Sequence, residues 1–363
     1  MFSKILFTFK LYSNIFFNVN GLADNINPST INGHSIKMPQ RAIILYSDTK
    51  REYFPTEQQY LTEKDAEIDA SIVADYLNKL NIETHCIPAN SETPLLLKEI
   101  RPDIVFNLVG TVKGFDHLAA TVPAMLELLE IPYTGSGILG EALTYNKFLV
   151  KELLKQAGIS VPNFQLFNTH NDFIDPALRF PLISKLNEIH GSVEINRNAI
   201  SRDEKHLRER IKYLIETYKQ PILVEEFIVG REVTAILLEG LNRKVYFAER
   251  VYNVEEEFQF TTFDMAWKNS VDNFVFEKYD DDVLREVIKK AFSILRMSDY
   301  AKFDIRLDKS GRYYIIDSNS NPAFGPKELE YSIGVILDIY GVTFEEILKR
   351  LIVNTLSESK NIQ

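Results

Sequence analysis

The 363-residue sequence is poor in cysteine, with Cys86 as its single thiol. One thiol excludes an internal disulfide framework and any cysteine-rich metal site. Such a composition is typical of a reducing compartment, and we therefore predict a cytoplasmic protein. Cys86 itself is most simply interpreted as a small buried hydrophobic residue.

An excess of positive charge and a long apolar run are also missing. The formal net charge is -10, so the composition does not suggest the basic surface expected of a nucleic-acid-binding protein. Lys4 and Lys10 interrupt the apolar N-terminal stretch before it reaches the length of a membrane-spanning helix. A secretory signal stays open, although no small-residue cleavage site is evident. We predict neither a nucleic-acid partner nor stable membrane insertion.

Residues 1–37 differ from the rest in being rich in Phe, Ile and Asn. Met38 then begins "MPQRAIILYSDTK", which reads as the start of a domain with its first strand. We interpret residues 1–37 as an appended, disordered segment or as the product of a misassigned start codon. The remainder divides into an N-terminal α/β domain (38–143), a central subdomain (144–227) and a C-terminal subdomain (228–358).

Strands and helices alternate in the first of these domains. The apolar run Ala42–Tyr46 is typical of a buried parallel strand, and apolar residues recur at helical spacing over Asp65–Leu80. Asp103–Val109 is a second apolar strand. This βαβ rhythm predicts a parallel sheet covered by helices. Further along, pairs of consecutive strands such as "VTAILLEG" and "KVYFAERV" predict separate α+β subdomains.

An unusual stretch near the C-terminus, "AKFDIRLDKSGRYYIIDSNSNP", reads as a β-hairpin with its turn at Asp308–Gly311. We predict that Leu307 pairs with Arg312, which places Asp304 opposite Ile315 and makes Asp317 its diagonal neighbour. The core face would then carry Phe303, Ile305, Leu307, Tyr314 and Ile316.

The other face of this hairpin carries Asp304 and Asp317, with Asn319 just beyond. Mg²⁺ prefers oxygen ligands and is commonly held by one or two carboxylates together with substrate phosphates. The pattern therefore predicts a magnesium site. The alternative is a solvated polar face in which Lys302 and Arg306 act as counter-ions.

Two lysines stand where a phosphate could bind. Lys147 begins a helix after a Gly/Ser loop, and Lys185 ends an apolar strand before a glycine-containing loop. Taken singly, each is more simply a surface lysine. Glu225, Glu226 and Glu232 lie at the end of a buried strand, where acids could contact a ribose or an adenine.

In combination these features are more specific. Lys147, Lys185, "LVEEFIVGREV" and the acidic hairpin, in this order, resemble the ATP-grasp fold. "IPYTGSGILGEALTYNKFLVKELLKQAGISVP" resembles the D-alanine–D-alanine ligase family, and the likeness runs from about residue 41 to residue 356. It implies an N-terminal parallel-sheet domain, a central nucleotide-gripping domain and a C-terminal antiparallel-sheet domain.

The resemblance also implies chemistry. The family joins a carboxylate to an amine, using ATP and Mg²⁺ or Mn²⁺, through an acyl-phosphate. Its substrates are small amino acids or short peptides, and its members are often homodimers. The implied residue roles are Lys147 and Lys185 on the ATP phosphates; Glu225, Glu226 and Ile228 at adenine; Glu232 on ribose; Gly191 and Ser192 in a phosphate-covering loop; Lys268 in a second closing loop; Lys302 on the intermediate; and Asp304, Asp317 and Asn319 on the metal.

Several positions depart from the family pattern. Asp317 stands where a Glu is usual, Lys302 where an Arg is usual, and His190 is an uncommon residue in the phosphate-covering loop. The residues that bind the nucleotide in this family are kept in the sequence, whereas the residues that recognise its amino-acid substrates are not. The sequence thus predicts the reaction class and leaves the substrates open. Two alternatives remain: a nucleotide-binding scaffold without ligase activity, or a peptide-tailoring ligase of a biosynthetic cluster.

Overall fold

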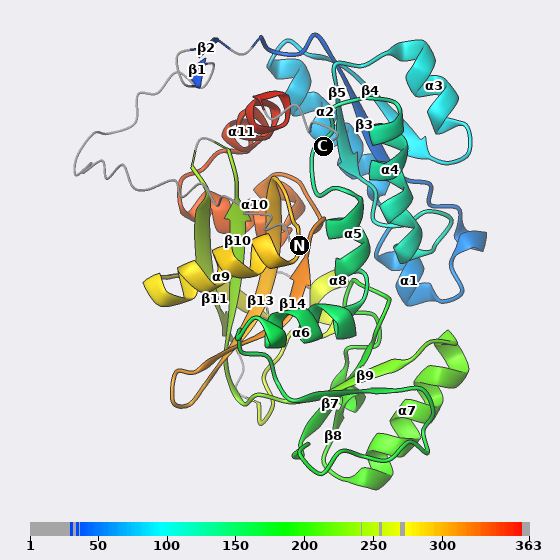
Figure 1. Cartoon of the computed structure of the whole chain (residues 1–363), viewed down its shortest axis with the longest axis vertical. Coiled ribbons are helices and arrows are strands. Elements are labelled where there is room, and N and C mark those ends of the chain that lie inside the picture. Colours follow the sequence, from blue (N-terminus) through cyan, green and yellow to red (C-terminus); the bar gives the residue numbers. More distant parts are fainter. Residues whose placement is uncertain are drawn as a thin grey trace, which may run out of the picture.

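The computed structural model describes residues 30–31, 34–35, 37–240, 242–253, 256–268 and 273–357. Three groups of elements surround a common centre, with the N-terminal strands at the upper right of Figure 1 and the central strands at its lower end. Most of the segment 1–37 lies outside the described residues. Its described part is a pair of two-residue strands, β1 (Thr30–Ile31) and β2 (His34–Ser35), which pair with each other.

The N-terminal unit is a three-stranded parallel sheet in the order β4-β3-β5. Its middle strand, β3 (Arg41–Ser47), is buried over six of seven residues, as its apolar sequence predicts. β5 (Ile104–Leu108) is also confirmed, but the edge strand β4 (Glu83–Ala89) was not predicted. Its helices are α1 (Glu57–Leu61), α2 (Ala66–Lys79), α3 (Thr93–Ile100) and α4 (Thr121–Leu128).

The central unit is a four-stranded antiparallel sheet in the order β6-β9-β7-β8. It consists of β6 (Phe164–Phe167), β7 (Leu182–Leu186), β8 (Ile200–Ser201) and β9 (Ile222–Glu226). α7 (Glu204–Tyr218) begins where Asp203 accepts a hydrogen bond from the backbone N–H of His206. Leu207, Ile211 and Leu214 form its buried stripe, which packs on the sheet.

The C-terminal unit is a five-stranded antiparallel sheet in the order β12-β11-β10-β13-β14. Its strands are β10 (Gly230–Leu238), β11 (Lys244–Tyr252), β12 (Phe274–Tyr279), β13 (Tyr300–Asp308) and β14 (Tyr313–Asn319). α9 (Asp282–Ile294) crosses one face together with α6 (Lys147–Gln156) (Figure 1). The predicted combination of parallel and antiparallel α/β units is thus confirmed.

The register predicted for the β13–β14 hairpin is wrong. Leu307 pairs with Tyr313, and a bulge between Asp304 and Ile305 then shifts the ladder, so that Asp304 lies directly opposite Asp317. The one-residue shift at the turn places Ile315 rather than Tyr314 and Ile316 on the core face of β14, and the bulge then adds one further residue on that strand. Phe303, Ile305 and Leu307 of β13 are buried in the core as predicted. Ile315 is therefore the buried apolar residue of β14, while Ile316 lines the cavity described below.

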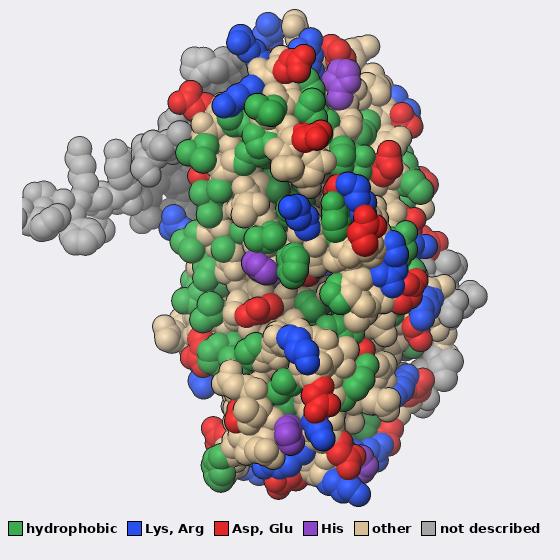
Figure 2. Space-filling model, turned by 90° about the vertical axis from the view of Figure 1, so that its right-hand side faces the viewer, with side chains coloured by type: hydrophobic (Ala, Val, Ile, Leu, Met, Phe, Trp, Pro, Cys, Tyr) green, Lys and Arg blue, Asp and Glu red, His purple; other side chains and the backbone are tan. Residues whose placement is uncertain are grey.

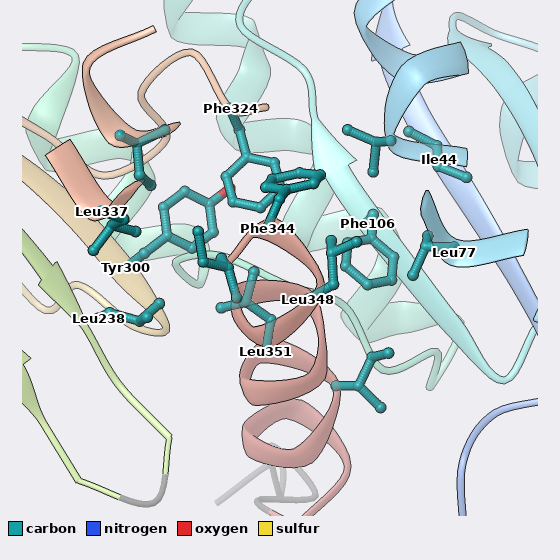
Figure 3. Packing of buried hydrophobic residues seen from close by; sticks show 14 of the residues in the cluster. Ile44, Leu77, Phe106, Leu238, Tyr300, Phe324, Leu337, Phe344, Leu348 and Leu351 are labelled. Atoms are coloured by element: carbon teal, nitrogen blue, oxygen red, sulfur yellow. The ribbon is translucent and has the colours of Figure 1, made fainter. Parts of the chain in front are cut away.

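One apolar core joins the first and last parts of the chain. α11 (Phe344–Ser357) lies between the N-terminal sheet and α10 (Ser332–Ile339), and Figure 3 shows its side chains between the two groups. Leu348 and Leu351 are fully buried in the cluster that also contains Ile44, Phe106 and Leu238. The parallel and antiparallel sheets are consequently held in one arrangement.

In the described part of the chain, no helix has both the length and the apolar character needed to cross a membrane. On the face drawn in Figure 2, acidic and basic side chains are interspersed.

Two short helices remain to be described. α5 (Ile138–Thr144) precedes α6, and α8 (Phe263–Trp267) follows β11. α8 contributes Met265, Ala266 and Trp267 to the cavity described below, whereas α5 supplies Glu141, which bonds to Ser320 behind it.

Candidate active site

All three units contribute to one cavity of about 680 Å³, a size typical of small-molecule sites. Its lining includes Lys147, Lys185, Gly191, Ser192, Glu225, Glu226, Ile228, Glu232, Lys302, Asp304, Asp317 and Asn319. These are all but one of the residues singled out from the sequence. The exception is Lys268, which is about half exposed and pairs with Asp264 at 3.0 Å on α8.

Lys147 is placed by the start of α6. The preceding residue, Asn146, caps the helix by accepting a hydrogen bond from the backbone N–H of Leu149 at 3.0 Å. Only 8% of Lys147 is exposed, and its Nζ donates to the carbonyl of Ile189 at 2.9 Å. Burial lowers the pKa of Lys147, and Asp317 and Asp116 oppose that effect. An anion in the cavity would therefore find a desolvated cation.

Lys185 shares a buried carboxylate with a lysine that the sequence analysis missed. Glu225 on β9 lies 3.2 Å from Lys185 on β7 and 3.2 Å from Lys151 on α6. Lys185 and Lys151 also donate to the carbonyl of Ile316, each at 3.2 Å. Lys151 does not line the main cavity, and burial lowers its pKa to about 8. The feature of the sequence that could have identified Lys151 is its spacing of four residues from Lys147.

The loop that carries Gly191 and Ser192 closes against α1 and α8. Gly191 has φ +71°, and a Cβ there would lie 2.6 Å from the methyl group of Thr62, so the position requires glycine. Trp267 Nε1 donates to the Gly191 carbonyl at 2.7 Å, and Gln58 Oε1 accepts from the backbone N–H of Glu194 at 2.8 Å. The loop is thus fixed from both sides over the cavity.

The two acids of the hairpin face the cavity from adjacent strands. Asp304 Oδ1 accepts from the Thr234 hydroxyl at 3.1 Å, and its Oδ2 contacts the Lys302 ammonium. Within the described residues, Asp317 has no hydrogen-bond or ion-pair partner for its carboxylate. Burial raises the pKa of Asp317, but Lys147, His190 and Lys185 outweigh burial and hold it at about 2. Asp317 is therefore an ionised acceptor.

This donor set fits a hard divalent cation. Asp304 and Asp317 offer carboxylate oxygens at one point of the ladder, and Asn319 follows two residues later. Among the described residues there is no group of three or more His, Cys, Asp or Glu side chains suited to a metal, so Asn319 and the phosphates of a nucleotide would have to complete the set. The alternative of a polar face with counter-ions is met in one half: Lys302 pairs with Asp304, whereas Arg306 is buried and bonded to Glu232 and to the Gly230 carbonyl.

Glu232 occupies a more constrained position than the sequence indicated. It is buried between Arg250 and Arg306, and it also accepts from Tyr252 at 2.9 Å and Thr261 at 3.0 Å. The nearby wall is apolar, built from residues such as Phe227, Phe260 and Ile183. The Glu226 carboxylate accepts from Asn163 and from the backbone N–H of Arg179, whereas the Ile228 segment borders the cavity.

Asn321, which follows the β13–β14 hairpin, fixes the end of β14 through two hydrogen bonds. It accepts from Tyr300 at 2.9 Å and donates to the Val109 carbonyl at 3.1 Å. Its neighbour Ser320 donates to the buried Glu141 at 2.6 Å. These bonds hold the end of β14 against the N-terminal unit.

Fold and site together define a class, the ATP-grasp ligases, which are ATP-dependent enzymes. The family described as D-ala D-ala ligase C-terminus matches residues 153–353, more than half of the chain. The chain therefore belongs to the D-alanine–D-alanine ligase family.

Individual proteins show the same likeness at low identity. An uncharacterised Sinorhizobium fredii protein, y4sG, is 31% identical over 60% of this chain, which spans 65% of that relative's length. The D-alanine–D-alanine ligase of Aquifex aeolicus is 28% identical over 69% of this chain and 82% of its own. A Bacillus anthracis D-alanine–D-alanine ligase solved with ATP superimposes with a TM-score of 0.69 at 19% identity, covering 89% of this chain and all of that one.

Proposed function

We propose that this protein is an ATP- and Mg²⁺-dependent ligase that joins an amino-acid carboxylate to an amine through an acyl-phosphate. The observation that carries the proposal is the convergence in one cavity of Lys147, Lys185 and the ionised Asp317 with the glycine loop at Gly191. Cations and loop amides on one side and carboxylates on the other are what a metal–nucleotide complex needs.

In this proposal the apolar wall around Phe227 and the backbone at Ile228 hold adenine, beside Glu225. Glu232 contacts ribose by exchanging one of its present bonds. Lys147, Lys185 and the Gly191–Ser192 amides bind the phosphates. Asp304, Asp317 and Asn319 would hold Mg²⁺ or Mn²⁺, which supplies charge neutralisation at phosphate oxygens.

The reaction would proceed in two displacements. A substrate carboxylate attacks the γ-phosphorus of ATP, and ADP leaves. The amine nitrogen of the second substrate then attacks the acyl carbon, phosphate leaves, and the nitrogen loses a proton. Lys302 and Lys185 stabilise the negative charge that develops on oxygen, and the closed loop keeps water away from the acyl-phosphate. The contribution of the protein is mainly positioning and electrostatic stabilisation.

The test is ADP release from Mg²⁺-ATP in the presence of a panel of single amino acids and pairs of amino acids. Turnover that depends on an amino acid, with formation of a dipeptide or amide detected by mass spectrometry, is the expected result. Mg²⁺-dependent ATP binding without turnover on any acceptor would favour the scaffold alternative instead. Cytoplasmic location and homodimer formation are further parts of the proposal, testable by fractionation and by light scattering.

A further inference from the structure

Lys151 is a buried lysine to which the proposed reaction gives no role. It lies on α6, one turn after Lys147, and 3% of its side chain is exposed. It does not line the main cavity, so a nucleotide bound there would not touch it. Burying an ammonium group is costly unless the group is paired, and the partners of Lys151 therefore indicate what it does.

Two ammonium groups share the carboxylate of Glu225, of which 1% is exposed. Lys151 Nζ lies 3.2 Å from Oε2, and Lys185 Nζ lies 3.2 Å from Oε1. No other cation of the described residues lies within 4 Å of this carboxylate. The three groups together carry one positive charge in excess. Because Lys185 lines the cavity and Lys151 does not, that excess faces the cavity at Lys185.

A backbone carbonyl joins the same two lysines. Lys151 and Lys185 each donate to the carbonyl of Ile316 at 3.2 Å, and Lys151 also donates to the carbonyl of Ile315 at 3.4 Å. The partial negative charge of the shared oxygen offsets part of the repulsion between the two ammonium groups. Lys151 is thus held in place from β14 as well as from β9, and its charge stays beside Glu225.

Removal of Lys151 would change the charge balance at Lys185. Glu225 would keep Lys185 as its one ion-pair partner in the described part of the chain, and that pair has no net charge. A phosphate would then have to take Lys185 away from Glu225, and a buried carboxylate left without a partner is strongly destabilising. With Lys151 present, Glu225 stays paired whichever contact Lys185 makes.

We propose that Lys151 is a positioning residue, which neutralises Glu225 and so leaves the charge of Lys185 available to a phosphate of ATP. The inference rests on the proposed binding of ATP phosphates by Lys185 and deepens it. Lys151 acts through Glu225 and contacts no part of the nucleotide. When adenosine binds, Lys185 can remain on Glu225, so the effect of Lys151 is confined to ligands that carry phosphates.

The experiment measures the binding of ATP and of adenosine to the full chain by isothermal titration calorimetry. Lys151→Met keeps an apolar stem of similar length and removes the charge. We expect it to weaken ATP binding roughly 10- to 100-fold, the usual size of a lost charged interaction, and to change adenosine binding by less than about 2-fold. Lys155→Met, at an exposed position one turn further along α6, is the matched control and should bind both ligands as the wild type does.

A second substitution tests whether Lys151 acts through Glu225. In the Glu225→Gln background no carboxylate needs compensation, so adding Lys151→Met should change the ATP affinity by less than about 3-fold, whereas a merely structural lysine would cost the same in both backgrounds. The double variant removes both buried charges together and should fold even if Lys151→Met alone does not. Its comparison with Glu225→Gln therefore decides the question in either case.

The outcomes separate this inference from the ligase function. Unchanged ATP affinity in Lys151→Met, an equal loss for ATP and adenosine, or a double variant that binds ATP far more weakly than Glu225→Gln would overturn the role of Lys151 and leave the ligase function standing. A Lys151-dependent affinity for ATP in a protein that turns over no amino acid would support the inference and overturn the ligase function. A wild-type protein that binds no ATP would overturn both.

Discussion

Asp317 owes its character to a balance between burial and neighbouring ammonium groups. Burial opposes its charge, yet the nearby lysines keep its pKa at about 2, so it is ionised at any pH where the protein is used. A carboxylate held in this state beside Asp304 without a direct partner is prepared for a cation rather than for a structural salt bridge. The proposed metal-binding role would thus account for a buried carboxylate that stays ionised.

Replacing Asp317 should separate folding from activity. We expect Asp317→Asn to lower kcat by about 100-fold or more, because it removes a negative ligand while keeping the side-chain volume. Folding should persist, as judged by circular dichroism, and half-saturation by Mg²⁺ should rise. Asp282→Asn, at an almost fully exposed position on α9, serves as the control. An Asp317→Asn variant with wild-type turnover and Mg²⁺ dependence would disprove the metal assignment.

Glu63 should make the ligand-free protein sensitive to pH. Its folded-state pKa of about 8 lies above the ordinary value of 4.5, so the folded state holds a proton that the unfolded chain has lost. The free energy of unfolding should consequently fall as pH rises from about 4.5 to 8, by up to about 1.4 kcal/mol per pH unit from this group. Asp116 and Glu141, also raised by burial, act in the same direction.

Urea unfolding at several pH values measures this contribution. Glu63→Gln should flatten the decline between pH 5 and pH 8 and should be more stable than the wild type at the upper end. Identical slopes for the two proteins would mean that Glu63 is already solvated or paired. Ser47, Asp69 and Asp116 face this side chain and are unchanged in the comparison.

At the scale of elements, the strongly patterned segments were predictable and the finer geometry was not. The apolar runs predicted β3 and β5, and the helical spacing of apolar residues predicted α2. β4 escaped because it is an edge strand whose first residues alternate between exposed and half-buried, and because Pro88 breaks the pattern. The hairpin register was wrong because neither the exact length of the turn nor the later bulge can be recognised from the amino-acid composition.

The site followed the same rule. Residues at strand ends and helix starts were found from the sequence, because the predicted ends of the strands and helices fix their positions. Lys268 was assigned through the resemblance, and the structure places it outside the cavity wall. Lys151, Glu63 and Asp116 were missed because only the folded chain brings them to the centre. Single acids and lysines have too many ordinary surface roles to be recognised alone.

The proposed phosphate-covering role of the Gly191–Ser192 loop can be followed by fluorescence, because Trp267 is the only tryptophan of the chain. Its indole donates to the Gly191 carbonyl, so its environment should change when nucleotide enters beneath the loop. We expect a saturable, Mg²⁺-dependent change in fluorescence on ATP addition. Gly191→Ala should weaken ATP binding roughly 10-fold or more, since the new methyl group meets Thr62 at a left-handed backbone position.

A matched substitution distinguishes loop closure from a general loss of structure. Gly311→Ala also lies at positive φ but in the exposed hairpin turn, with nothing within 4 Å of an added Cβ. Gly311→Ala should carry the same cost of placing alanine at a positive φ as Gly191→Ala, but it should not weaken ATP binding. If ATP leaves the Trp267 signal unchanged, or if both alanine variants bind ATP equally well, the loop does not cover the nucleotide.

At the scale of the whole molecule, α11 determines how the active site is assembled. The cavity draws residues from three units, so its geometry depends on the core that joins the first and last of them. Phe344, Leu348 and Leu351 occupy that core between the two sheets (Figure 3). A site shared among units requires such a rigid connection, since a shift of about 1 Å between catalytic groups can cost 100-fold in rate.

Leu351→Ala tests whether the units unfold together. Leu351 is completely buried, so truncation should lower the free energy of unfolding by about 2–5 kcal/mol. Lys349→Ala, on a partly exposed position of the same helix, should change it by less than about 0.5 kcal/mol. Far-ultraviolet circular dichroism reports on the whole chain, whereas Trp267 fluorescence reports on the site. Because one core links the parallel and antiparallel sheets, both signals should move to lower urea concentration together, and two separate transitions would show that the units are stable independently.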